Sequence, residues 1–206
     1  MAADTIPSRL FKQATSRPSA PAYHRKVGES WKATSWGEYA ALVRRAGKSL
    51  MALGVPAGGT VSVLGFNRPE WVVMDVAAMC IGAAPAGIYT TCSPSEVRYI
   101  IHHAESKVVL LENAMQWDKV HKELGNMPLL EHVVMMEGAP KIDHPLVMSW
   151  EDWLTFFAAA ITFTAVGVSL QQAHWVDDMP PFVPTAVAGL LIGMIAARVK
   201  YYAAAI

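Results

Sequence analysis

The chain has 206 residues, with 17 Lys and Arg against 17 Asp and Glu, so its formal net charge is zero. This length allows one domain, or one domain with an appendage, and the lack of a basic surplus excludes a dedicated nucleic-acid-binding protein. Its two cysteines, Cys80 and Cys92, stand in no metal or redox spacing and exclude a disulfide framework.

Through residue 153, segments with helical periodicity alternate with short apolar runs that are typical of buried strands. Three helix starts carry N-cap signals: Ser35 and Ser93 each have a glutamate three residues later, and Asn67 stands shortly before a first-turn proline. The predicted helices cover about residues 5–17, 35–54, 70–81, 93–104 and 113–124; the predicted strands cover 22–25 and 31–34, which form a hairpin, and 60–66, 84–89, 107–111 and 132–136.

Strands and helices that alternate at this spacing imply right-handed βαβ units. The strands are short and almost wholly apolar, as in a parallel sheet that is buried on both faces. The sequence therefore predicts an α/β fold with a partial, Rossmann-like parallel sheet and flanking helices.

Two glycine-containing runs are similar to phosphate loops. In Gly47-Lys48-Ser49, however, Leu42 stands where the loop needs its first glycine, and the run lies inside a helical pattern. We interpret Lys48 as a lysine on a solvated helix face. The pair Gly58-Gly59 completes no G-x-G-x-x-G motif, so we interpret it as a turn.

Three further groups of polar residues have both a functional and a structural interpretation. The adjacent His102 and His103 point about 100° apart on a helix and have no second cluster to complete a metal site. Asp75, inside an apolar helix, is a functional carboxylate or, as we favour, a hydrogen-bonded structural one. The hydroxyls of Thr90, Thr91 and Ser93 follow a strand, where α/β sheets bind ligands; we favour the alternative that they cap the next helix.

Several runs in this part of the chain are distinctive. They are Val63–Trp71 (VLGFNRPEW), Gly82–Thr91 (GAAPAGIYTT), and Tyr99–Ile100 followed by His103–Glu105. Together they resemble the N-terminal part of a long-chain fatty acyl-CoA synthetase of the bubblegum type, in the AMP-binding, adenylate-forming superfamily. The resemblance covers about residues 5–153.

This resemblance implies ligation of a fatty acid to coenzyme A: ATP first forms an acyl-adenylate, and the thiol then displaces AMP. It implies ATP, Mg and coenzyme A for the complete enzyme, together with a T-S-G-T-T-G-x-P-K-G loop, an acidic magnesium ligand and a lysine-bearing lid. The sequence contains none of these motifs, so no catalytic, cofactor-binding or metal residue is assigned. We expect an N-terminal fragment that is inactive and binds no cofactor alone. It is expected to bind fatty acid, coenzyme A and ATP only when the missing part is supplied.

The tail differs in composition from the rest of the chain. Residues 154–170 and 182–197 form uncharged segments of 17 and 16 residues, slightly short of the ~20 that a membrane span needs. Aromatic residues flank them, as in membrane belts. The tail thus predicts a synthetase-like domain at 1–153 and a transmembrane hairpin at 154–206, with spans at about 154–173 and 182–200; two buried core helices are the alternative.

The turn between these segments has no Lys or Arg, whereas Arg198 and Lys200 follow the second one. By the positive-inside rule we expect a membrane location, with lipid around 154–206 and with both termini and the synthetase-like part in the cytoplasm. Residues 151–200 also resemble, more weakly, the first membrane hairpin of bacterial transglutaminase-like membrane proteins.

Three functions are therefore open. The first is a fragment of a long-chain fatty acid–CoA ligase. The second is a membrane-anchored protein without enzymatic activity, and the third is the N-terminal piece of a transglutaminase-like membrane protein. The missing phosphate loop argues against activity of this chain in all three.

Overall fold

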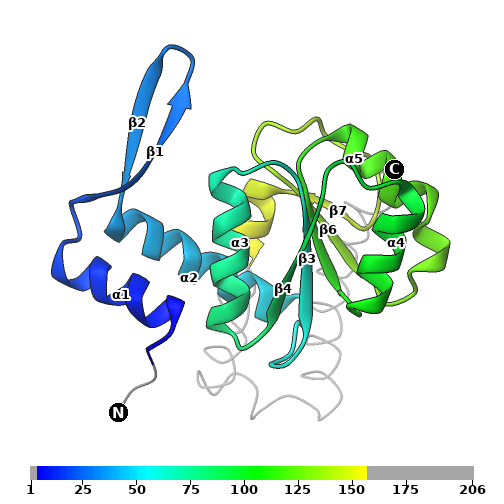
Figure 1. Ribbon diagram of the computed structural model, residues 1–206, viewed down its shortest axis with the longest axis horizontal. Coiled ribbons are helices and arrows are strands. Elements are labelled where there is room, and N and C mark those ends of the chain that lie inside the picture. The colour runs from blue at the N-terminus through cyan, green and yellow to red at the C-terminus, as the bar shows by residue number, and fades with distance from the viewer. Residues whose placement is uncertain (1–3, 157–206) are drawn as a thin grey trace, which may run out of the picture.

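A parallel β-sheet with helices on both faces forms the body of the protein, and a β-hairpin projects from one side (Figure 1). The structure, a computed structural model, describes residues 4–156. Its helices are α1 (Ile6–Ser16), α2 (Trp36–Ala52), α3 (Pro69–Cys80), α4 (Pro94–His103), α5 (Ala114–Lys122) and the 3-10 turn η1 (Leu124–Asn126). Its strands are β1 (Pro21–Val27), β2 (Ser30–Ser35), β3 (Thr60–Leu64), β4 (Ala84–Ile88), β5 (Val108–Leu111), β6 (His132–Met135) and β7 (Val147–Ser149).

The main sheet has five strands in the order β4-β3-β5-β6-β7, and every neighbouring pair is parallel. This confirms the parallel sheet expected from the alternation of elements. Strand β7 has no counterpart among the predicted strands, because it is only three residues long and only partly buried. Strand β4 forms the opposite edge of the sheet and contains Pro85, which has no backbone N–H.

Capping boxes fix the starts of three helices. Ser35 and Ser93 accept hydrogen bonds from the backbone N–H groups of Glu38 and Glu96, whose carboxylates bond back to the serines, as the sequence predicts. Thr5 caps α1 in the same way. The prediction that Asn67 caps α3 is wrong: the N-cap is the following residue, Arg68, whose backbone is extended, and the proline after it occupies the first helical position.

The core lies on both faces of the sheet because side chains alternate along each strand. On one face, Val108 and Leu110 of β5 contact the cluster that includes α1, α2 and α3. On the other face, Val109 and Leu111 contact the cluster that includes α4 and α5. The result is a three-layer arrangement of helices, sheet and helices (Figure 1).

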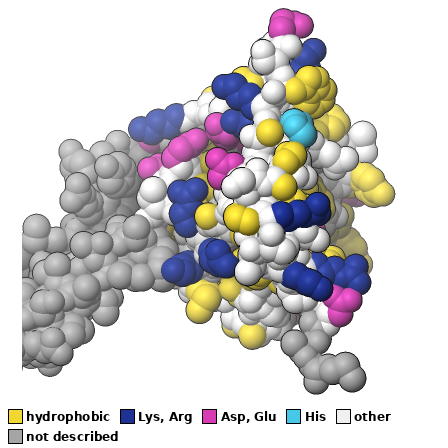
Figure 2. Space-filling model, turned by 90° about the vertical axis from the view of Figure 1, so that its left-hand side faces the viewer, with side chains coloured by type: hydrophobic (Ala, Val, Ile, Leu, Met, Phe, Trp, Pro, Cys, Tyr) yellow, Lys and Arg dark blue, Asp and Glu magenta, His cyan; other side chains and the backbone are white. Residues whose placement is uncertain are grey.

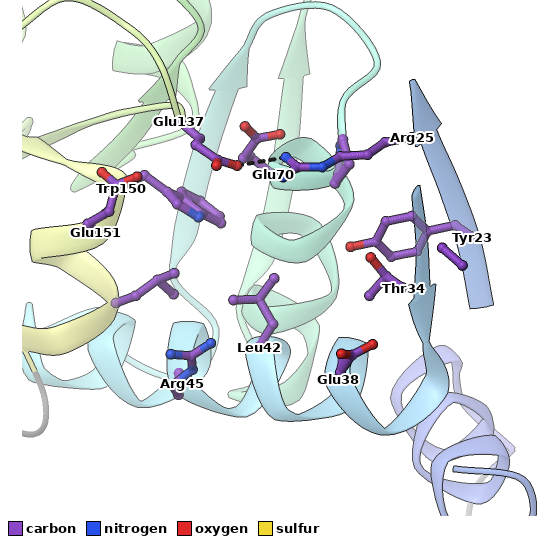
Figure 3. Close-up of a pocket in the computed structure, with 13 residues that line it drawn as sticks. Tyr23, Arg25, Thr34, Glu38, Leu42, Arg45, Glu70, Glu137, Trp150 and Glu151 are labelled. Atoms are coloured by element: carbon purple, nitrogen blue, oxygen red, sulfur yellow. Dashed lines mark hydrogen bonds and ion pairs between the residues drawn. The ribbon is translucent and has the colours of Figure 1, made fainter. Parts of the chain in front are cut away.

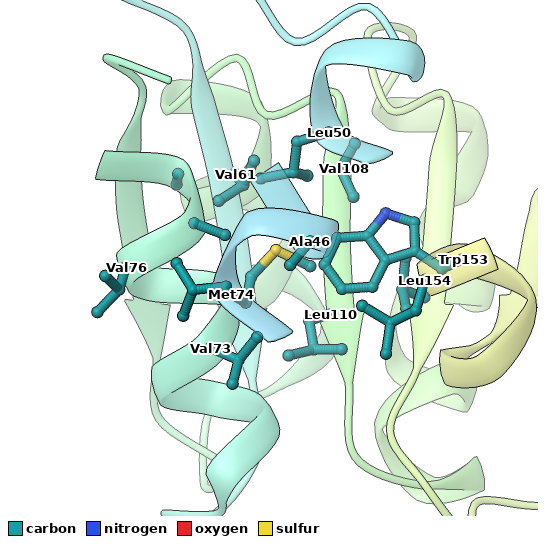
Figure 4. Close-up of a cluster of buried hydrophobic side chains, with 14 of the residues drawn as sticks. Ala46, Leu50, Val61, Val73, Met74, Val76, Val108, Leu110, Trp153 and Leu154 are labelled. Atoms are coloured by element: carbon teal, nitrogen blue, oxygen red, sulfur yellow. The ribbon is translucent and has the colours of Figure 1, made fainter. Parts of the chain in front are cut away.

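A segment after β7 completes the first of these clusters. Residues 150–156 are helical, and Trp153, which is fully buried, lies beside Leu110, Met74 and Ala46 (Figure 4). Leu154, the first residue beyond the predicted domain boundary, packs in the same cluster.

The predicted membrane location needs correction. No helix among residues 4–156 is long and apolar enough to cross a membrane. The predicted spans lie outside the described residues, except for the first three positions of span 154–173. There Leu154 and Phe156 pack against the protein core, so the apolar side chains at the start of this span cover the sheet.

Candidate functional site

The carboxyl edge of the sheet is where α/β proteins of this kind bind ligands, at the point where strand order reverses. Here that point lies between β3 and β5, because β4 flanks β3 on its other side. Glu112, just after β5, spans the gap: its Oε2 accepts a hydrogen bond from the N–H of Phe66 at 3.0 Å. A carboxylate of the protein itself therefore lies at this point of the edge.

Gly65 makes this close approach possible. A Cβ at this position would lie 2.9 Å from both Glu112 Cβ and Met136 Cε. A larger residue would therefore push apart the strand ends that meet at the crevice.

A second cluster of charged groups lies where α3 begins. The Arg68 guanidinium donates to Glu70 Oε1 and, at 2.8 Å, to the carbonyl oxygen of Glu137. Glu137 Oε2 in turn forms an ion pair with Arg25 Nη1 at 2.7 Å (Figure 3). This network joins the β1–β2 hairpin, the start of α3 and the loop after β6.

Glu70 is the most unusual member of this network. It is only 2% exposed, and its Oε2 has no hydrogen-bond partner among the described residues. An unsatisfied buried carboxylate oxygen costs free energy. Its burial is tolerated because Arg68 neutralises the carboxylate through Oε1.

A cavity of about 420 Å³ lies beside this network, between the hairpin, α2, α3 and Trp150 (Figure 3). Arg25, Arg45 and Glu70 contribute charge, whereas Leu42 and Trp150 contribute apolar surface. No Ser, Cys or His is among the described residues that line it. The cavity thus offers ionic and apolar contacts.

Charge is distributed unevenly over the molecule. Residues 4–52, which form α1, the hairpin and α2, contain nine Lys and Arg and three Asp and Glu. Residues 53–156 contain six and twelve. Figure 2 shows the basic side chains spread over the α1–hairpin–α2 side. That side attracts anionic groups more strongly than the rest of the described structure.

Ser93, one of the three hydroxyl-bearing residues that follow β4, has a structural role. Ser93 caps α4, and its N–H and hydroxyl both donate to Glu96; these bonds lower the pKa of Glu96. The carbonyl oxygen of Thr90 accepts a hydrogen bond from Lys119 Nζ at 2.6 Å, which ties this loop to α5. The capping interpretation is confirmed for Ser93.

The two glycine-containing runs form no phosphate loop. Gly47-Lys48-Ser49 lies within α2, and a Cβ on Gly47 would sit 3.6 Å from the carbonyl oxygen of Ala77, in ordinary contact between α2 and α3. Gly58 has a φ of +79° in the turn before β3. Both interpretations made from the sequence are confirmed.

The remaining candidates are not brought together. His103 stacks on Tyr99 in the last turn of α4, with ring centroids 5.5 Å apart. Asp75 is half-buried on α3, and burial raises the pKa of its carboxyl. Residues 4–156 contain no group of three or more His, Cys, Asp and Glu side chains that could hold a metal ion.

No sequence pattern assigns a role to Arg25, Glu112 or Glu137, which belong to the two clusters at this edge. The Arg68–Glu137 contact joins residues 69 positions apart, and Phe66–Glu112 joins residues 46 apart. No local spacing signals such contacts. Only the position of Glu112 directly after an apolar strand points to the carboxyl edge.

The fold is that of adenylate-forming enzymes. A fatty acyl CoA synthetase from Mycobacterium tuberculosis superposes with a TM-score of 0.58 and 24% identity, over 63% of this chain and 26% of that one. An anthranilate CoA ligase superposes with a TM-score of 0.59 and 22% identity, over 72% and 26%. At these identities the likeness concerns the fold alone.

Sequence comparison gives the family. The sequence model of the AMP-binding enzyme family matches residues 10–186, so the chain belongs to that family. Human long-chain-fatty-acid–CoA ligase ACSBG2 is 32% identical over 152 residues, which cover 73% of this chain and 22% of the relative. ACSBG1 of Macaca fascicularis is 32% identical over 129 residues, or 63% and 18%. The chain thus spans about a fifth of the length of these curated relatives.

These comparisons correct two predictions about the tail. The family match continues through residue 186, across the whole first predicted span, so the resemblance to transglutaminase-like membrane proteins is unsupported. The predicted membrane location is overturned, because the described residues contain no spanning helix and the relatives are acyl-CoA ligases. An uncharged stretch shorter than about 20 residues also fits an apolar segment of a globular enzyme.

Proposed function

We propose that this chain provides the first part of the catalytic fold of a long-chain fatty acid–CoA ligase and is inactive on its own. The observation that carries the proposal is the match to human ACSBG2 over 73% of this chain. The complete reaction joins a fatty acid to coenzyme A through an acyl-adenylate. In this proposal the chain contributes the parallel sheet and its carboxyl edge.

The residues present do not fit magnesium-bound ATP. At the switch point of the sheet, where a phosphate would be bound, the Glu112 carboxylate accepts a hydrogen bond from the N–H of Phe66. The negative charge of this carboxylate repels a phosphate. The sequence also lacks the T-S-G-T-T-G run. We therefore assign nucleotide binding to a part of the ligase fold that residues 4–156 do not supply.

A chimera tests the proposal directly. The segment of human ACSBG2 that matches this chain is replaced by the corresponding residues of this chain, and palmitate-dependent ATP–pyrophosphate exchange is measured. We expect exchange within about tenfold of ACSBG2, a change of roughly 1.4 kcal/mol in the barrier. ACSBG2 without the segment is the negative control, and the 206-residue chain alone should give the no-enzyme rate.

Two results would contradict the proposal. A chimera that melts cooperatively but exchanges no faster than the deletion control would show that this chain does not supply a ligase part. Exchange by the chain alone, above the blank, would show that it holds the triphosphate after all.

A further inference from the structure

Three ring side chains meet between α5 and the loop that leads into β7. On α5, His121 stacks on Trp117 with ring centroids 5.0 Å apart. In the loop, His144 lies 5.0 Å from the Trp117 ring and 5.7 Å from the His121 ring. We call Trp117, His121 and His144 the histidine clasp. It links α5 to the loop between β6 and β7.

His144 also holds the turn before β7. Its Nδ1 accepts a hydrogen bond from the backbone N–H of Leu146 at 3.3 Å, and only an unprotonated nitrogen can accept such a bond. The N–H of Val147 donates to the carbonyl oxygen of His144 at 2.9 Å. The carbonyl oxygen of Leu146 accepts from the N–H of Val133, in β6, at 2.7 Å. Neutral His144 therefore stabilises the turn through which β7 joins the sheet.

Three effects oppose protonation of His144. A proton on Nδ1 would face the N–H of Leu146, so the hydrogen bond between them would be lost. The side chain is partly buried, and burial disfavours the charged form. A charged His121 ring, 5.7 Å away, would repel a charged His144 ring. Burial and, to a smaller extent, the charge of His121 accordingly lower the pKa of His144 below 6.5.

The other charged groups near the clasp do not compensate for this cost. The remaining charged or titratable side chains on α5, on β6 and in the loop before β7 are Asp118, Lys119, Lys122, His132, Glu137, Lys141 and Asp143. Glu137 pairs with Arg25, and Lys119 donates to a backbone carbonyl oxygen. Within residues 4–156, no carboxylate forms an ion pair with either histidine of the clasp. Protonation of His144 is therefore not stabilised by a counter-charge in contact with it.

We propose that the histidine clasp holds β7 against the sheet at neutral pH and releases it when His144 is protonated. Strand β7 has three residues and pairs with β6 alone, so it can open locally while the rest of the sheet stays folded. In the released loop His144 regains its ordinary affinity for protons. The released state therefore binds a proton that the attached state does not, and attachment weakens as the pH falls below about 6.5.

Hydrogen exchange of the 206-residue chain at about pH 7.5 and 5.5, corrected for the intrinsic effect of pH, tests this proposal. The reporter is a peptide that covers residues 142–149, and peptides from β3 and β5 report on the centre of the sheet. We expect opening of the reporter to increase about threefold to tenfold at the lower pH; about tenfold is the ceiling for one histidine with an ordinary pKa of ~6.5. The β3 and β5 peptides should change less than about twofold.

Two variants separate the titration of His144 from its structural role. His144→Asn keeps an acceptor for the N–H of Leu146, since asparagine readily bonds to the backbone two residues further on, but it does not titrate. Its reporter peptide should lose the pH response. His103→Gln is the matched control, because this histidine is exposed on α4 and stacks on Tyr99, outside the clasp. The control should respond to pH like the wild type.

Four results would overturn the proposal. The first is equal opening of the wild-type reporter at both pH values, and the second is a full pH response in His144→Asn. The third is a response that disappears in His132→Gln, which would assign the effect to β6. The fourth is an equal increase in the β3 and β5 peptides, which would show unfolding of the whole domain instead of local release of β7.

Discussion

Replacing Trp153 with alanine should destabilise the domain strongly. Trp153 is the largest fully buried side chain of the described structure, and its ring lies 5.1 Å from that of Trp150. A tryptophan buries about 150–250 Å², worth roughly 4–6 kcal/mol. Its Nε1–H has no partner among residues 4–156, so alanine also removes a penalty of about 1–3 kcal/mol. The expected net loss is about 3–4 kcal/mol, against a total stability of about 5–15 kcal/mol.

Urea denaturation of the 206-residue chain, followed by far-ultraviolet circular dichroism, measures this loss. With a slope of about 1–3 kcal/mol per molar urea, the midpoint should fall by roughly 1–4 M. Trp31→Ala is the control, since Trp31 is 67% exposed and its loss should change stability by less than about 0.5 kcal/mol. A loss below about 1 kcal/mol for Trp153→Ala, or equal losses for both variants, would show that the segment after β7 is not part of this core.

Two further substitutions test buried polar groups. Ser62 and Ser106 share a buried hydrogen bond of 2.8 Å, so Ser62→Ala should cost about 1–3 kcal/mol in urea melts, and a double alanine variant that costs the full sum of the singles would exclude coupling. Burial lowers the pKa of His132 below 6.5 in the folded protein. Between the folded pKa and about pH 6.5, the unfolded chain therefore binds a proton that the folded chain does not. The stability that neutral His132 contributes is present above about pH 6.5 and is lost as the pH falls through the folded pKa. Midpoints at about pH 7.5 and 5.5 should differ less in His132→Gln, and an unchanged difference would rule this histidine out.

Local signals predicted most of the fold correctly. Ser35 and Ser93 start helices because their hydroxyls and the glutamates three residues later bond only to nearby backbone. The alternation of apolar runs and helices predicts the parallel sheet for a similar reason, because the apolar run that indicates each strand lies within that strand's own residues. The N-cap of α3 is predicted one residue too early, because Asn67 has a good capping side chain, whereas the extended backbone of Arg68 takes that position.

Features that depend on distant residues were beyond such reasoning. Strand β7 forms only by pairing with β6, as Val147 lies opposite Val133. The Arg25–Glu137 ion pair joins residues 112 positions apart. The absence of charge in the tail is ambiguous in a similar way, since it fits both a lipid-facing helix and an apolar part of a globular enzyme. At its start, Leu154 faces the protein core.

Pro85 affects which edge of the sheet can pair with a further strand. It lies in β4, at one end of the strand order, and supplies no N–H to a strand laid against the open side. A further strand at that end would meet a gap in its hydrogen-bond ladder, and edge prolines of this kind oppose such pairing in natural sheets. At the other end, β7 carries no proline. An additional strand, from the same polypeptide or from another, would therefore pair with β7.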